Sequence, residues 1–141
     1  MKTEVELPSV PSYLIELALG DLEKCEASPE YEIHMGIWHR EDGPVCKVCL
    51  AGAVMAQTFR LERSREVVDV EDYFDQTTAD HLEALDDFRT GFIEDGCDTL
   101  GCYGDLPEEL REWPTPDYGH DPAGFKSSMR ELASRLRAVG L

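Results

Sequence analysis

The sequence predicts a mainly helical α+β fold, and three features of its hydrophobic pattern lead to that prediction. A stretch with almost no charge, residues 44–58, has apolar or small side chains around a whole helical circumference, as buried helices do. Residues 11–27 and 121–139 repeat their apolar side chains every three to four positions, which indicates amphipathic helices. Residues 31–38 instead alternate apolar and polar side chains, as a half-buried strand does. We expect an apolar central helix, two or three amphipathic helices and a minimal two-stranded sheet.

Length and composition indicate a single compact domain, residues 1–141. The chain has 141 residues and is 42% hydrophobic, which is enough to form a core without disulfides or a metal. Residues 1–10 form an expected loose lead-in that lacks the basic and apolar segments of an export signal, and no apolar run reaches membrane length. The five cysteines are therefore expected to be reduced thiols. These features predict a soluble protein of the cytoplasm.

The first half of the chain is predicted to alternate helix, strand and helix. Ser12 is the expected cap of the first helix, which ends at Ser28-Pro29. The strand at 31–38 needs a partner for its backbone hydrogen bonds, and residues 66–70 are the best candidate. Residues 39–43 are expected to form a polar turn into the central helix.

The central helix is predicted to begin at Pro44, because the missing N–H of proline costs nothing at the first helical position. Gly52 lies inside this helix, where glycine costs about 1 kcal/mol relative to alanine unless another element must come close. We therefore expect a tightly packed neighbour at Gly52.

The second half of the chain is predicted to contain two further main helices. Thr77 or Thr78 is the expected cap of the first, which has apolar side chains on one face and acidic ones on the other. Residues 94–120 form an irregular acidic segment, in which 107–113 could make two helical turns. Asp121 is the expected cap of the last helix, and Gly140 closes it.

The negative charge is concentrated in one block of the sequence. Between Glu66 and Asp121 there are 18 acidic residues and two basic ones, a net charge of −16, whereas the whole chain carries −17. Such a field repels nucleic acid and anionic membranes and attracts basic protein surfaces. The block is either a well-solvated exterior or a partner-binding face. The candidate binding residues are Asp69, Glu71, Asp72, Asp75, Asp80, Glu83, Asp86 and Asp87.

Two cysteines and two histidines lie close together in the sequence and form the main candidate for site chemistry. Cys46 and Cys49 follow His34 and His39, and both residue types bind zinc. Cys97 and Cys102 could supply further ligands. Alternatively these are buried thiols, which are common in cores, and His39 orients the start of the central helix.

Cysteine chemistry gives two further alternatives for the same residues. A thiol at the N-terminus of a helix is activated by the helix dipole, as in redox proteins, although the parallel sheet that usually precedes such a motif is not predicted here. Cys46 or Cys49 could also act as a nucleophile, with His39 or His34 as its base.

Part of the sequence resembles a group of small uncharacterised proteins encoded by bacteriophages and prophages. The resemblance depends on Gly36-Ile37-Trp38-His39 and on the run from Cys46 to Ala56, with a weaker likeness at 85–91 and in the last helix. It implies a phage setting, and therefore the cytoplasm of a host cell. It implies no activity and no catalytic residue.

These observations lead to three functional hypotheses. The first is a non-catalytic phage protein that engages a basic host or defence protein through the acidic block, in one version at the surface where that protein binds nucleic acid. The second is a zinc- or thiol-dependent protein centred on Cys46 and Cys49, and the third is a structural or assembly component of the virus. The first hypothesis involves no cofactor, no membrane and no direct contact with nucleic acid.

Overall fold

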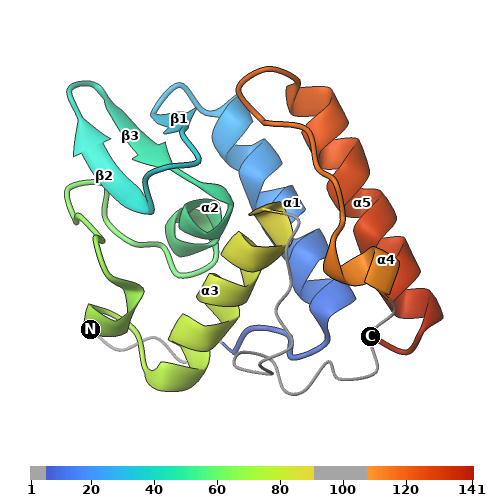
Figure 1. Cartoon of the computed structure of the whole chain (residues 1–141). Coiled ribbons are helices and arrows are strands. Elements are labelled where there is room, and N and C mark those ends of the chain that lie inside the picture. The colour runs from blue at the N-terminus through green and yellow to red at the C-terminus, as the bar shows by residue number, and fades with distance from the viewer. Residues whose placement is uncertain (1–5, 91–107) are drawn as a thin grey trace.

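The computed structural model describes residues 6–90 and 108–141, which form a helical domain with a small sheet at one end (Figure 1). The α+β class predicted from the sequence is confirmed. Residues 1–5 of the predicted lead-in, residues 94–107 of the predicted irregular segment, and Cys97 and Cys102 lie outside the described residues. Among the helices of the described part, none combines the length and apolar character that a membrane crossing requires.

The two predicted amphipathic helices at either end of the chain are present as α1 (Pro11–Ala27) and α5 (Pro122–Ala138). They lie side by side in Figure 1 and are joined by ion pairs such as Arg130–Glu23, with 2.8 Å between nitrogen and oxygen. Asp121 caps α5 as predicted, because its Oδ1 accepts a hydrogen bond from the backbone N–H of Gly124 at 2.9 Å.

The predicted cap of α1 is wrong. The helix begins after Val10, and Pro11 occupies the first helical turn. Ser12 is instead inside that turn, where its hydroxyl donates to the carbonyl oxygen of Leu141 at 3.0 Å. The backbone N–H of Ser12 donates to the same oxygen at 3.1 Å, so the C-terminal residue occupies the place of a capping side chain.

The predicted helix over 44–58 is a strand followed by a helix, α2 (Leu50–Gln57). Strand β3 (Val45–Val48) buries Cys46 and Val48 and leaves Val45 and Lys47 half-buried, which is the alternation of a strand. Helix α2 starts at Leu50, and every residue from Leu50 to Ala56 is buried. The stretch is therefore central, as predicted, but its first part is extended because it pairs with strands on both sides.

The sheet has three strands rather than the predicted two, in the order β1-β3-β2. Strand β1 (Tyr31–Ile33) pairs parallel to β3, and β2 (His39–Asp42) pairs antiparallel to it. Residues 39–43 were predicted to be a turn, but residues 39–42 are β2. Gly43, with φ at +65°, forms the tight connection to β3.

The predicted strand at 31–38 ends at Ile33, because the chain must turn to bring β2 to the other side of β3. The backbone N–H of Ile37 bonds to the carbonyl of His34 at this turn. The predicted pairing of this strand with 66–70 is wrong, because β1 pairs with β3 and the isolated bridge of Val67 is to His39 of β2.

Helix α3 (Gln76–Thr90) is amphipathic as predicted, and it packs on α2 and on a single 3-10 turn, η1 (Val70–Asp72). Its buried face contains Leu82, Leu85 and Phe88. Its cap differs from the prediction, because Asp75 rather than a threonine accepts the hydrogen bond from the N–H of Thr78, at 2.8 Å. A short helix, α4 (Glu108–Arg111), lies within the predicted helical turns at 107–113.

Candidate functional site

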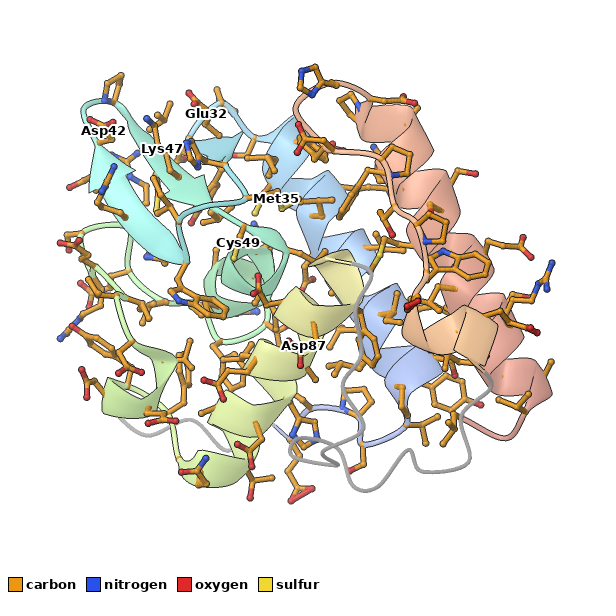
Figure 2. The ribbon with its side chains drawn as sticks, in the orientation of Figure 1. Glu32, Met35, Asp42, Lys47, Cys49 and Asp87 are labelled. Atoms are coloured by element: carbon orange, nitrogen blue, oxygen red, sulfur yellow. The ribbon has the colours of Figure 1, made fainter. Side chains whose placement is uncertain are left out.

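The candidate partner-binding residues lie on two adjacent elements, η1 with its flanking residues and α3. We call these eight residues the acidic face: Asp69, Glu71, Asp72, Asp75, Asp80, Glu83, Asp86 and Asp87. The four that precede α3 are exposed, and the four on α3 are half-buried. Figure 2 shows Asp87 on α3, whereas Asp42 and Lys47 belong to the sheet. These residues span 19 positions of the sequence, and the fold therefore places them on two neighbouring elements.

Local structure explains how η1 presents its carboxylates. The side chain of Asp69 accepts a hydrogen bond from the N–H of Glu71 at 3.1 Å and so caps the turn. Val70 is buried and anchors the turn in the core. Because one apolar residue is anchored between acidic ones, the acidic side chains at 69, 71 and 72 remain in solvent.

The electrostatics of Glu83 show that the two elements act on each other. Partial burial raises the pKa of this carboxyl group above its ordinary value, and the neighbouring negative charges raise it further. Those charges belong to Glu71, Asp80, Asp69 and Asp87, in decreasing order of effect. Carboxylates from η1 and from α3 therefore form one electrostatic cluster.

Several basic side chains form ion pairs elsewhere in the described structure. Lys126 and Arg130 of α5 bind acidic residues of α1. Arg63 binds Glu30 and Glu41 beside the sheet. Within residues 6–90 and 108–141, no lysine or arginine nitrogen lies within 4.0 Å of a carboxylate oxygen of Glu71 or Glu83. Glu71 and Glu83 therefore contribute negative charge that no lysine or arginine of the described residues neutralises by an ion pair.

The second candidate site contains one close pair, Cys46 and His39, both fully buried. The Nδ1 of His39 lies 2.6 Å from the carbonyl oxygen of Arg65, so this nitrogen must be the protonated donor. The other ring nitrogen, Nε2, lies 3.6 Å from the sulfur of Cys46 and can accept the thiol proton. Burial raises the pKa of the Cys46 thiol and lowers the pKa of His39. The pair is thus a neutral thiol beside a neutral imidazole rather than an activated thiolate.

The other two predicted zinc ligands have separate local roles. The sulfur of Cys49 caps α2 by accepting a hydrogen bond from the N–H of Gly52 at 3.3 Å. His34 is exposed, and its Nδ1 accepts from the N–H of Gly36 at 3.2 Å. In the part of the chain that the structure describes, no three His, Cys, Asp or Glu side chains form a group that could hold a metal ion.

A third buried thiol, Cys25 of α1, was not among the predicted site residues. Gln57 donates a hydrogen bond to its sulfur at 3.5 Å, and burial raises its pKa to about 11. The negative charge of Asp21 contributes to this rise. Its position on the apolar stripe of the first helix predicts burial, but no sequence signal links it to Cys46.

Comparison with known proteins adds no relative to this account. No protein family, no curated protein and no solved structure matches the chain. Functional inference therefore depends on the charge, burial and geometry of the residues described above.

Proposed function

We propose that this protein is a non-catalytic binding protein that engages a basic host or defence protein through its acidic face. The observation that carries the proposal is the electrostatic cluster centred on Glu83, to which both η1 and α3 contribute carboxylates. A surface of one charge sign attracts a partner of the opposite sign and accelerates its association. A host protein that presents lysines and arginines to nucleic acid has the complementary surface.

A solvated exterior explains the acidic face less well than a binding role does. Partial burial and, after it, the like charges around Glu83 raise its pKa, so both make ionised Glu83 less favourable in the folded state. Elsewhere, as between α1 and α5, acidic residues form ion pairs with basic ones. A basic partner would relieve the repulsion on the acidic face, whereas solvation alone needs no such concentration.

The phage setting of this proposal comes from the sequence resemblance at residues 36–39 and 46–56. Small phage-encoded proteins act inside a bacterial host, where basic partners include proteins that bind nucleic acid. The proposed partner is therefore a host or defence protein in the host cytoplasm. The protein would cover that partner's nucleic-acid surface without contacting nucleic acid itself.

The test compares two variants that lose the same amount of negative charge. One variant combines Asp69→Asn, Glu71→Gln, Asp80→Asn and Glu83→Gln, and the control combines Glu6→Gln, Glu32→Gln, Glu62→Gln and Glu112→Gln, all exposed residues outside the acidic face. Basic proteins captured from a bacterial lysate are purified and titrated against the wild type and both variants at several salt concentrations. We expect the first variant to bind at least about tenfold more weakly and with a shallower salt dependence. Equal binding by the two variants, or affinity that does not change with salt, contradicts the proposal.

The contact between Cys46 and His39 favours a second candidate function, a thiol- or zinc-dependent protein. Native mass spectrometry of protein purified without chelator, with a count of free thiols, is the direct test. A zinc mass increment that is lost in Cys46→Ser and Cys49→Ser supports this candidate. Unchanged metal content, stability and binding in those variants would exclude it.

A further inference from the structure

A surface groove lies beside the acidic face and extends it toward the sheet. Its volume is about 510 Å³, and its lining comes from the segment before η1 and from the end of η1 itself. The lining residues are Ser64, Arg65, Glu66, Val68, Asp72 and Tyr73. Asp72 belongs both to this groove and to the acidic face, so the two surfaces are continuous.

The groove exposes two apolar side chains that core packing does not explain. Val68 is 73% exposed, the highest value among the exposed large hydrophobic residues of the described chain, and Tyr73 is 44% exposed. The neighbours Val67 and Val70 are buried, so the segment is anchored in the core while Val68 points to solvent. Exposed apolar and aromatic side chains beside a groove are typical of interaction sites.

The charges around the groove favour a cationic ligand. Glu66 and Asp72 line the groove together with a single cation, Arg65. Asp69 and Glu71 are close in the sequence to these lining residues. The guanidinium carbon of Arg65 lies 5.9 Å from the centre of the Tyr73 ring, so Arg65 covers one face of this ring, and Tyr73 as a whole remains 44% exposed.

We propose that the groove binds an extended segment of the partner protein in which an apolar residue adjoins an arginine or lysine. The apolar residue packs on Val68 and Tyr73, and the cation binds the carboxylate of Asp72. This inference rests on the proposed function and names the chemistry of the partner's anchor. Apolar and aromatic anchors supply much of the affinity at interfaces, and the surrounding charges supply orientation and rate.

The test uses two short peptides of equal charge, one of alternating arginine and valine and one of alternating arginine and glycine. We expect the arginine–valine peptide to bind at least about tenfold more tightly to the full chain, because only its side chains can fill the apolar part of the groove. Val68→Ser and Tyr73→Ser should each reduce this preference to about twofold or less. Both residues are exposed, and thermal unfolding of each variant checks its fold.

Two matched variants control for the loss of exposed apolar surface. Tyr13 is also exposed and also lies under an arginine, at 5.3 Å from the guanidinium carbon of Arg137, so Tyr13→Ser matches Tyr73→Ser. Val139→Ser matches Val68→Ser. Neither control should change the preference for the arginine–valine peptide.

Failure of the proposal for the groove can be distinguished from failure of the proposal for the acidic face. Equal binding of the two peptides, no binding of either, or a preference that survives in Val68→Ser and Tyr73→Ser, overturns the groove. The variant neutralised at residues 69, 71, 80 and 83 tests the acidic face separately. Loss of these negative charges should weaken the binding of both peptides by the same factor. If the two peptides bind the wild type equally and both bind this variant more weakly, the proposal for the acidic face is retained and the proposal for the groove is excluded.

Discussion

The carbonyl oxygen of Trp38 lies so close to Gly52 that a Cβ added to this glycine would come within 1.7 Å of it. The contact holds the end of the 34–38 connection against the first turn of α2. Because the obstructing atom belongs to the backbone, it cannot move aside as a side chain could. The close neighbour predicted at Gly52 from the sequence is thus confirmed, and its identity is a backbone carbonyl.

Gly52→Ala should destabilise the protein by about 3 kcal/mol. The gain in helix propensity is about 1 kcal/mol, and a backbone overlap of this severity outweighs it. Urea unfolding followed by circular dichroism measures the change in the free energy of unfolding. A variant as stable as the wild type would contradict the observed packing.

Gly20→Ala is the matched control and should have the opposite effect. Gly20 also lies inside a helix, α1, but a Cβ there meets nothing within 4 Å. Only the propensity term remains, so we expect stabilisation of about 0.5 to 1 kcal/mol. If both substitutions destabilise equally, the cost at residue 52 does not come from Trp38.

The hydrophobic pattern predicts the long helices but not the division of 44–58 into two elements. Strand β3, Val45–Val48, contains only four residues, too few for their alternation to stand out from the apolar helix that follows. Its extended conformation depends on pairing with Tyr31–Ile33 and with His39–Asp42, which is information from other parts of the chain. Tertiary pairing here overrides the local helical pattern.

The candidate site follows the same division between local and long-range information. The sequence shows how many acidic residues the block contains, but it does not show which of them gather. Glu71 reaches the neighbourhood of Glu83 because η1 packs on α3, although 12 positions separate them. Similarly, Cys46 meets His39 through the β2–β3 pairing, whereas Cys49, three residues further on, caps α2.

Glu83→Gln should stabilise the protein at neutral pH. The folded pKa of Glu83 is raised, so the folded state binds its proton more readily than the unfolded chain does, and stability falls as pH rises through that range. Above this range the ionised group costs stability, and the amide removes that cost. The expected gain is less than about 1 kcal/mol because the group is only partly buried.

The gain from Glu83→Gln should disappear below about pH 4, where the carboxyl group is protonated in both states. It should also shrink in high salt, which screens the repulsion from Glu71 and Asp80. Urea unfolding at pH 7 and pH 3.5 measures the difference. Glu32→Gln, on an exposed position of β1, is the control. A gain of the same size at both pH values would mean that charge repulsion is not its source.

The three described cysteines should react slowly with a thiol reagent in the native protein. Cys25 and Cys46 are fully buried, Cys49 nearly so, and burial raises the pKa of the first two, which lowers their thiolate content. At pH 8 we expect modification at least about a hundredfold slower than in urea, limited by local opening. The measurement uses a variant with Cys97→Ser and Cys102→Ser, so that only three thiols contribute. Rapid native modification of Cys46 would instead favour the thiol-dependent candidate.

Thr58→Val should lower the free energy of unfolding, because it removes a hydrogen bond to a buried carboxylate that joins α1 to the end of α2. Asp21 is 3% exposed, and the hydroxyl of Thr58 donates to its Oδ2 at 2.5 Å. Burial raises the pKa of Asp21, whereas this hydrogen bond and Lys24 lower it. Removing the donor leaves the charged oxygen without that partner, which typically costs about 2 kcal/mol.

The pH dependence of this loss separates the hydrogen bond from simple packing. Without Thr58 the folded pKa of Asp21 rises further, so the folded state takes up a proton more easily and the penalty grows as pH rises above the ordinary carboxyl range. Urea unfolding should therefore show a large loss for Thr58→Val at pH 7 and a smaller one near pH 3. Thr58→Ser keeps the donor, and it should retain most of the stability at both pH values. A loss of the same size at pH 3 and pH 7, or an equal loss in Thr58→Ser, would assign the effect to the packing of the missing methyl or hydroxyl group rather than to the charge on Asp21.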